Sequence, residues 1–164
     1  MNAVYSGSFD PVTLGHMDII TRAANLSERL TVAVLNNGNK NMLFSLDERF
    51  EQMKSLAGHI QNVTVVRFSG SLIELFGELS ADAVVRGLRT PADFDHEFLY
   101  ANALKSINPK IETLFFAADP ALMHISSTMV KDAARFGCDI KKMVPNYIID
   151  AVKKKVQNKD WGNV

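Results

Sequence analysis

The sequence has a single cysteine, balanced charge and no long hydrophobic run, and each absence excludes a class of protein. Cys138 alone cannot form an intrachain disulfide or a thiolate metal site. Lysine and arginine together number 18, as do aspartate and glutamate, so no overall field favours nucleic acid or an anionic membrane. No apolar stretch approaches the roughly 20 residues of a membrane span. The first residues resemble a strand rather than a signal peptide. We expect a cytoplasmic protein with no nucleic-acid or membrane partner.

Several catalytic signatures are also missing. The motifs GxGxxG of dinucleotide oxidoreductases and GxxxxGK[ST] of P-loop kinases do not occur. No serine lies in a GxSxG elbow, which argues against a hydrolase triad of that kind. The histidines lack HxxxH spacing, so no zinc site is expected; they are His16, His59, His96 and His124.

Short β-branched or apolar runs alternate with longer segments of helical period. The expected strands are residues 3–6, 30–35, 63–68, 83–86 and 111–117, and the expected helices are residues 14–25, 45–57, 71–79, 92–107, 128–136 and 145–156. The alternation predicts right-handed βαβ crossovers. We therefore expect a single-domain Rossmann-like α/β fold with a five-stranded parallel sheet flanked by helices. The domain should cover residues 1–157, followed by a flexible tail at 158–164.

Some helix ends carry recognisable signals. Ser45 and Glu48 have the spacing of a capping box, in which each side chain satisfies an end amide. Gly137 suits a left-handed helix stop, and Pro145 suits a first helical position. Parallel sheets bind ligands at the carboxyl ends of their strands, so polar residues that follow the strands are the candidate functional groups.

The segment GSFDPVTLGH after the first strand has the composition of a phosphate-binding turn. Gly7 permits an unusual conformation or the close approach of a ligand, and Ser8 offers a hydroxyl. Thr13 can cap the next helix, which places Gly15 and His16 in its first turn, where unpaired amides favour anions. The same field favours a neutral His16 that donates through an N–H. The alternative is a tight turn with a capping histidine, but turn chemistry alone requires neither Gly15 nor His16.

Basic side chains follow two further strands. Lys40 comes after the second strand, where it is either solvated or a phosphate clamp. Arg86 and Arg89 flank Gly87 after the fourth strand, and their guanidinium forks match phosphate oxygens. The alternative is an ion pair with an acid of the next helix, namely Asp93, Asp95 or Glu97. One arginine can make that pair while the other faces a ligand.

Three consecutive hydroxyls precede the helix after the fifth strand, within the run ISSTMVK. They belong to Ser126, Ser127 and Thr128. An N-cap accounts for one of them. With the open amides of a helix start, the other two favour a second phosphate cradle.

GSFDPVTLGH resembles the [ST]-F-D-P-x-T-x-G-H signature of the nucleotidyltransferase superfamily, which also includes the class I tRNA synthetases. Lys40 and the runs LFSLDER, RGLRTPADFDHE and ISSTMVKDAARFG extend the resemblance over nearly the whole chain, to the bacterial phosphopantetheine adenylyltransferase family. That family transfers AMP from ATP to 4′-phosphopantetheine with Mg²⁺, giving dephospho-coenzyme A and pyrophosphate in the penultimate step of coenzyme A synthesis. The resemblance implies the same substrates here, coenzyme A as a feedback inhibitor, and a homohexamer.

The resemblance also implies residue roles. His16 would stabilise the transition state, with Lys40 and Arg89 as further catalytic residues. The acceptor 4′-phosphopantetheine would be bound by Ser8, Lys40, Leu72 and Arg86. ATP would be bound by Ser8, Phe9, His16, Gly87, Leu88, Arg89, Glu97, Leu122, Met123, His124, Ile125, Ser126, Ser127 and Thr128. Mg²⁺ would be held mainly through the ATP phosphates rather than by protein side chains.

The chain departs from the family pattern at a few positions. Ser6 stands where many members have proline, His96 where they have tyrosine, and Leu122 where they often carry an aromatic residue. The changes at His96 and Leu122 alter contacts near the nucleotide. Two alternatives remain: another superfamily member, such as a nicotinamide mononucleotide adenylyltransferase or a cytidylyltransferase, and a catalytically silent nucleotide or coenzyme A sensor.

Overall fold

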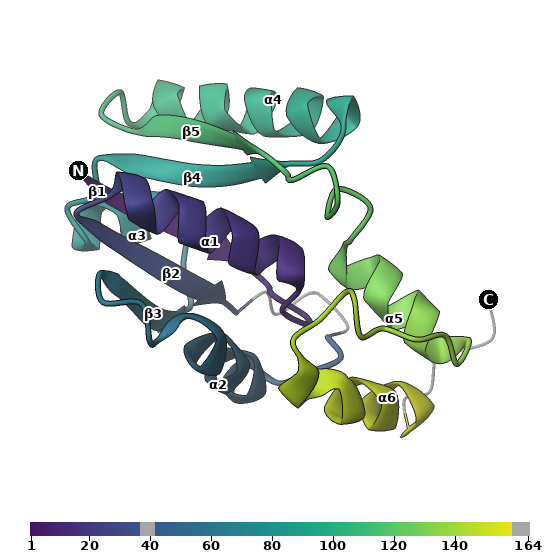
Figure 1. Ribbon diagram of the computed structural model, residues 1–164. Coiled ribbons are helices and arrows are strands. Elements are labelled where there is room, and N and C mark those ends of the chain that lie inside the picture. The colour runs from purple at the N-terminus through teal and green to yellow at the C-terminus, as the bar shows by residue number, and fades with distance from the viewer. Residues whose placement is uncertain (37–41, 159–164) are drawn as a thin grey trace.

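A computed structural model describes residues 1–36 and 42–158 and contains a parallel sheet with helices on both faces (Figure 1). The strands are β1 (Asn2–Gly7), β2 (Arg29–Leu35), β3 (Val63–Phe68), β4 (Ala83–Leu88) and β5 (Glu112–Ala117). The helices are α1 (Leu14–Leu26), α2 (Leu46–Ala57), α3 (Leu72–Glu78), α4 (Pro91–Ile107), α5 (Ser127–Arg135), the short 3₁₀ helix η1 (Asn146–Ile148) and α6 (Ile149–Asn158). The expected α/β fold is confirmed.

The strand order is β3-β2-β1-β4-β5, and every neighbouring pair is parallel. The chain therefore winds outward from β1 to one edge and then returns to the other side of β1. This reversal puts the topological switch point between β1 and β4, where doubly wound sheets open a crevice at their carboxyl ends. Among the described residues, no helix is long and apolar enough to cross a membrane.

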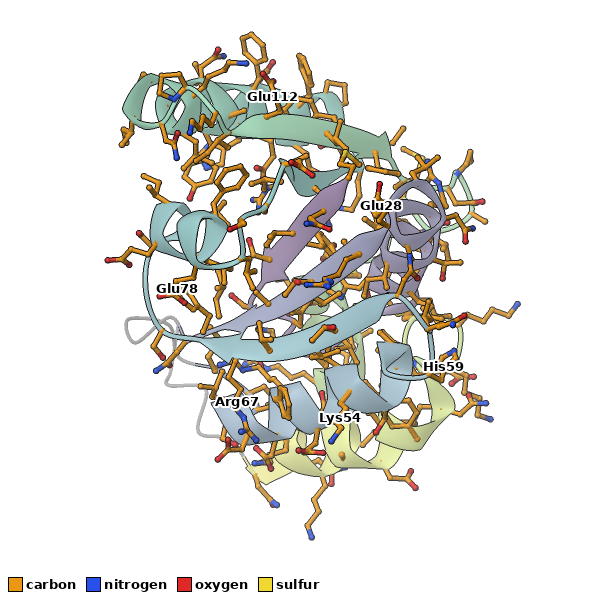
Figure 2. The ribbon with its side chains drawn as sticks, turned by 90° about the vertical axis from the view of Figure 1, so that its left-hand side faces the viewer. Glu28, Lys54, His59, Arg67, Glu78 and Glu112 are labelled. Carbon is orange, nitrogen blue, oxygen red and sulfur yellow. The ribbon has the colours of Figure 1, made fainter. Side chains whose placement is uncertain are left out.

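Two hydrophobic layers hold the helices on the sheet, and Figure 2 shows the side chains that fill them. On one face, Val32 and Val85 pack with side chains from α1, α2, α5 and α6. On the other face, Val4 and Val84 pack with α3 and with Leu104 of α4. Strands covered on both faces explain why their sequences lack a clean alternation of polar and apolar residues.

Most of the capping residues lie at helix ends, as the sequence predicted. Ser45 and Glu48 form the expected capping box, and Gly137 follows α5 with a φ of 73°. The expected helix over 145–156 is wrong in its first turn. Pro145 has an extended ψ of 142° and precedes η1, so it lies outside the helix rather than at its first position. Helix α6 also reaches Asn158, and the rest of the expected tail lies outside the described residues.

Two strands run further than expected, and this changes which way their side chains point. Strand β1 includes Gly7, and β4 continues beyond its expected end at residue 86 to Gly87 and Leu88. Successive residues of a strand face opposite sides of the sheet. Arg86 therefore points to the face covered by α3 and α4, while Gly87 points to the face covered by α1.

Candidate active site

The turn after β1 is built around the ring of Phe9. Phe9 has a φ of 50°, a left-handed conformation that is uncommon for a residue with a side chain. Its ring is buried and packs edge-on against Tyr5 at 5.5 Å and against His16 at 5.0 Å between centroids. A Cβ atom on Gly7 would lie 3.0 Å from this ring. Gly7 is thus required by the Phe9 ring, rather than by an unusual conformation of its own backbone.

His16 and Thr13 cap helix α1 together. The Thr13 Oγ1 accepts a hydrogen bond from the backbone N–H of His16 at 3.2 Å, and the His16 Nδ1 accepts one from the backbone N–H of Thr13 at 3.0 Å. Because a backbone amide only donates, Nδ1 carries no proton, and the proton of the neutral ring lies on Nε2. The capping alternative is therefore also true, because the side chain of His16 completes the capping box with Thr13.

The imidazole of His16 stays neutral at neutral pH. Burial, and next the positive charge of Arg89, lowers the pKa of His16 from 6.5 to about 4. We had expected the helix dipole to keep the ring neutral, whereas burial is the main cause here. The result is a neutral ring with an Nε2–H available as a donor.

Three cavities lie in a row here, and His16 lines two of them. The first, which we call the helix-start cavity, has a volume of about 310 Å³ and lies between the start of α1, the end of β4 and residues 122–128. The second, the α3–α4 cavity, has a volume of about 650 Å³ and lies between Ser6–Ser8, residues 70–72 and α4. The third, the junction cavity of about 130 Å³, shares Tyr5, His16 and Gly87 with the first and Ser8 and Arg86 with the second. His16 thus lies where a site on either side of the sheet can meet the other.

Both arginines of β4 and its following loop are paired with acids of α4. Arg86 donates from Nε and Nη2 to the two carboxylate oxygens of Glu97, each at 2.6 Å. Arg89 donates in the same way to Asp93, at 3.0 and 3.2 Å. Both arginines thus make an ion pair with an acid of α4, whereas the sequence suggested that pairing for one of them. Pairing through two nitrogens fixes the plane of each guanidinium, because the fork matches a carboxylate.

The third nitrogen of each arginine is the one left for a ligand. Among the described residues, Nη1 of Arg86 has only the carbonyl of Ser6, at 3.5 Å, and Nη1 of Arg89 only that of Ile125, also at 3.5 Å. Arg86 lines the junction and α3–α4 cavities, whereas Arg89 lines the helix-start cavity. Each cavity thus has one oriented guanidinium at its wall.

The three hydroxyls at the start of α5 differ in their hydrogen-bond partners. Ser126 is the N-cap, and its Oγ accepts from the backbone N–H of Met129 at 3.0 Å. Ser127 donates its hydroxyl to the carbonyl of Pro11 at 2.8 Å, which ties α5 to the turn after β1. Thr128 is the hydroxyl with no partner among the described residues. An N-cap thus accounts for one of the three hydroxyls, as expected, and a tertiary hydrogen bond to Pro11 accounts for a second. Thr128 and the first amides of α5, which no helix satisfies internally, remain for an anion.

Most of the remaining predicted residues line one of the three cavities. Leu122, Ile125 and the hydroxyl residues line the helix-start cavity, Phe9 lines the junction cavity, and Leu72 lines the α3–α4 cavity. Glu97, predicted with the ATP contacts, instead lines the junction and α3–α4 cavities. Three others line none of the three cavities: Leu88, Met123 and His124. Lys40 lies outside the described residues.

Sequence reasoning assigned no role to Asp10, Arg49 or Lys131, which hold this region together. The buried carboxylate of Asp10 accepts from the backbone N–H groups of Leu43 and Phe44 and lies 3.3 Å from the Lys131 Nζ. All three residues lie inside the runs that carried the family resemblance. Their tertiary contacts, however, join segments far apart in the chain.

Arg49 supports the turn from the opposite side. Its Nη1 donates to the carbonyls of Ser8 at 2.6 Å and Leu35 at 2.9 Å, and its Nε donates to that of Phe44 at 3.2 Å. The side chain is 2% exposed. One signal for it was present in the sequence: Arg49 lies four residues before Met53 on the apolar face of α2, where a charge needs internal partners.

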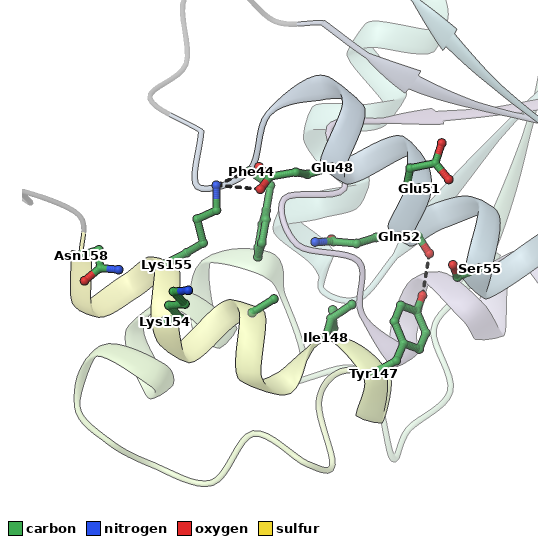
Figure 3. A pocket seen from close by; sticks show the side chains of 11 residues that line it. Phe44, Glu48, Glu51, Gln52, Ser55, Tyr147, Ile148, Lys154, Lys155 and Asn158 are labelled. Carbon is green, nitrogen blue, oxygen red and sulfur yellow. Dashed lines mark hydrogen bonds and ion pairs between the residues drawn. The ribbon is translucent and has the colours of Figure 1, made fainter.

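A further groove of about 690 Å³ lies between α2 and α6, away from these groups (Figure 3). Lys155 pairs with Glu48 across the groove at 2.8 Å. Tyr147 donates its hydroxyl to the Gln52 carbonyl at 2.5 Å. None of the predicted site residues lines it. The groove is therefore separate from the candidate active site.

Comparison with known proteins supports the same family. A cytidylyltransferase-like family model matches residues 4–133. A phosphopantetheine adenylyltransferase from Caldanaerobacter subterraneus subsp. tengcongensis is 44% identical over 153 residues, covering 93% of this chain and 96% of that protein. One from Clostridium botulinum is 45% identical over 157 residues, covering 96% of both chains. The chain belongs to the phosphopantetheine adenylyltransferase family.

A solved structure shares the fold of this phosphopantetheine adenylyltransferase family member. A putative nicotinate-nucleotide adenylyltransferase from Vibrio parahaemolyticus superposes with a TM-score of 0.66 over 92% of this chain and 97% of that one. At 17% identity, this likeness shows the fold alone.

Proposed function

We propose that the chain transfers the adenylyl group of ATP to 4′-phosphopantetheine, giving dephospho-coenzyme A and pyrophosphate. One observation carries the proposal: the junction cavity, which the neutral ring of His16 lines, connects the helix-start cavity to the α3–α4 cavity. Such a geometry suits a reaction in which two separately bound phosphate groups must come together. Family membership supplies the identity of the two substrates.

The reaction needs positioning and charge neutralisation more than proton transfer. An oxygen of the acceptor phosphate attacks the α-phosphorus of ATP, a new P–O bond forms, and the bond to the β-phosphate bridging oxygen breaks. The acceptor phosphate is already an anion, so no general base has to remove a proton. Two anions that repel one another must be held in line, and charge on the α-phosphoryl oxygens must be stabilised.

The helix-start cavity is the proposed ATP side. His16 would donate from Nε2 to an oxygen of the α-phosphate as negative charge develops there. The Nη1 of Arg89, the Thr128 hydroxyl and the first amides of α5 would hold the β- and γ-phosphates. The Ser127 hydroxyl is already used by Pro11, so its contribution would come from its backbone N–H.

The α3–α4 cavity is the proposed acceptor side. Arg86 presents Nη1 toward the junction, where an acceptor phosphate would approach the nucleotide. Leu72 and Leu99 line the wall further out and suit the apolar part of a pantetheine arm. Lys40, predicted to hold the acceptor phosphate, stays a prediction.

Mg²⁺ fits this site as an ion carried by the triphosphate. Among residues 1–36 and 42–158, no group of three or more histidine, cysteine or acidic residues could hold a metal. A hard cation that keeps most of its ligands from phosphate and water does not need such a group. When bound, Mg²⁺ would neutralise charge on the β- and γ-phosphates and make pyrophosphate a better leaving group.

Acceptor choice is the direct test. The purified chain is incubated with ATP, Mg²⁺ and either 4′-phosphopantetheine or nicotinamide mononucleotide, and pyrophosphate is measured. We expect release with 4′-phosphopantetheine alone. Release only with nicotinamide mononucleotide would contradict the proposed acceptor. No turnover with either, together with tight coenzyme A binding, would favour a sensor.

We also propose that the chain self-associates, as a homohexamer, through α4. Of its residues only Leu104 is buried, while Phe98, Leu99 and Ile107 are 48%, 68% and 66% exposed. Leu99 and Ile107, eight residues apart, lie on the same side of the helix, and an exposed apolar face is usually covered by a partner. Light scattering should give a smaller assembly for Ile107→Glu. The control Phe136→Glu changes another exposed aromatic residue, next to α5, and should match the wild type.

The same two cavities also suit coenzyme A as a feedback inhibitor of the reaction. Coenzyme A carries both a pantetheine arm and an adenine nucleotide, so we propose that it spans the α3–α4 and helix-start cavities. It should then compete with 4′-phosphopantetheine in steady-state kinetics, and a non-competitive pattern would contradict this.

We also propose that the reaction takes place in the cytoplasm, because the proposed substrate ATP is supplied there.

A further inference from the structure

Tyr5 lies in the central strand β1 and projects toward the face covered by α1. The residue is 7% exposed, and its ring packs edge-on against Phe9 at 5.5 Å. Neither the motifs nor the family resemblance gave it a role. The contact with Phe9 accounts for an aromatic ring at this position, but it does not account for the hydroxyl group of the tyrosine.

The hydroxyl of Tyr5 has no hydrogen-bond partner among the residues that the structure describes. A tyrosine buried to this degree normally finds one for its O–H group. The hydroxyl is not sealed in the core either. In the described part of the chain, the fully buried side-chain oxygens without a partner are those of Ser6 and Gln52. The Tyr5 oxygen therefore opens onto a cavity.

That opening is at the meeting point of the site. Tyr5, His16 and Gly87 are the described residues that line both the helix-start and the junction cavities. Gly87 has no side chain, so Tyr5 and His16 are the two side chains that can reach a group held there.

The charges around Tyr5 select the kind of ligand. Arg89 lines the helix-start cavity and Arg86 lines the junction cavity, both of which Tyr5 also lines, and each keeps its Nη1 for a ligand. Burial raises the pKa of Tyr5 to about 12, so the phenol keeps its proton and can donate. A neutral donor that shares a cavity with each arginine suits an anionic oxygen.

We infer that the Tyr5 hydroxyl binds a phosphoryl oxygen of the nucleotide beside His16, where the helix-start cavity meets the junction cavity. The inference rests on the proposed function, because it takes the nucleotide to be the ligand of the helix-start cavity. Tyr5 is thus a substrate-binding residue in its own right, and the unpaired hydroxyl is the group that a bound phosphate satisfies.

The test measures ATP binding rather than turnover, so that it does not depend on the acceptor. Calorimetry with ATP and Mg²⁺ compares the wild type with Tyr5→Phe, which removes the hydroxyl and keeps the ring against Phe9. We expect the Kd of the variant to rise by about tenfold or more, as for a lost hydrogen bond to a charged group. Its melting temperature should stay unchanged or rise, because no hydrogen bond within the described chain is lost.

Tyr147→Phe is the matched control. It removes a hydroxyl that donates to the Gln52 carbonyl in the groove between α2 and α6 (Figure 3), and it should leave the Kd for ATP unchanged. A Kd for Tyr5→Phe within twofold of the wild type would overturn the inference. A rise in Kd accompanied by a lower melting temperature would also overturn it, because the hydroxyl would then be structural. If the wild type binds ATP but does not use 4′-phosphopantetheine, the proposed acceptor fails while the inference is still decided by Tyr5→Phe. A wild type that does not bind ATP overturns both.

Discussion

The Nδ1 of His16 accepts a hydrogen bond from the backbone N–H of Thr13 at 3.0 Å. This one contact both caps α1 and determines which ring nitrogen carries the proton. The N-cap and the transition-state donor are thus the same imidazole, with Nδ1 directed into the helix start and Nε2 left for a ligand. Replacing His16 therefore removes both the helix cap and the Nε2 donor, and suitable variants should separate the two effects.

His16→Gln should change the pH dependence of stability. The pKa of His16 is about 4 in the folded chain and 6.5 in the unfolded chain, so between these values only the unfolded chain binds the proton. Stability is full above pH 6.5 and falls as the pH drops toward 4, by up to ~3 kcal/mol. Glutamine at this position can still complete the capping box with Thr13 but does not titrate.

Urea unfolding of both proteins from pH 8 to pH 4.5 checks this. The stability of the wild type relative to His16→Gln should decrease as the pH falls below 6.5. Parallel curves over the whole range would mean that His16 is not buried as a neutral ring.

Arg49→Lys should destabilise the chain although the charge is kept. Lysine cannot reach the carbonyls of Ser8, Leu35 and Phe44 together, so buried acceptors lose their donors. We expect a loss of roughly 2–4 kcal/mol in the free energy of unfolding, with a higher KM because the Ser8 turn loosens.

The matched change is Arg67→Lys at the surface, on β3 (Figure 2). Arg67 is 44% exposed, pairs with Asp47 at 3.0 Å and lies over the Phe50 ring. Its replacement should alter the free energy of unfolding by no more than about 0.5 kcal/mol. Equal effects of the two substitutions would show that the buried contacts of Arg49 do not matter.

Gly7→Ala should slow the reaction by displacing Phe9. The added methyl group would lie 3.0 Å from the Phe9 ring, which packs against His16, so the ring and then the imidazole must shift. Small displacements of a catalytic donor are costly, and kcat should fall by about tenfold or more.

Gly77→Ala is the control, because a Cβ atom there meets nothing within 4 Å. In helix α3 this substitution should stabilise the chain by about 0.5–1 kcal/mol and leave kcat unchanged. A Gly7→Ala variant with wild-type kcat would contradict the packing chain from Gly7 through Phe9 to His16.

The fold and the outline of the site could be predicted because their signals are local. Helix caps such as Ser45 with Glu48 are read within a few residues, and alternating elements predict the parallel sheet. The turn motif and Arg89 lie at the carboxyl edge of that sheet, where the topology brings them together.

The rest could not be predicted, because it depends on contacts between distant segments. The Arg49 side chain joins three segments, and the Ser127 hydroxyl bonds Pro11 across 116 positions of the chain. Whether Arg86 meets Glu97 depended on the end of β4, and our early strand end hid the alternation that separates Arg86 from Gly87. Tyr5 read as an ordinary strand residue, since nothing in the sequence says that its hydroxyl opens onto a cavity.

The most direct test of the account is the turnover of His16→Ala with ATP, Mg²⁺ and 4′-phosphopantetheine. Removing one donor to the reacting phosphoryl group should cost about 2.7–4 kcal/mol of barrier, a loss in kcat of roughly a hundred- to a thousandfold. The Kd for ATP, measured by calorimetry on the same protein, should change much less. A variant with near-wild-type kcat would contradict the central claim that the neutral Nε2–H of His16 stabilises the transition state.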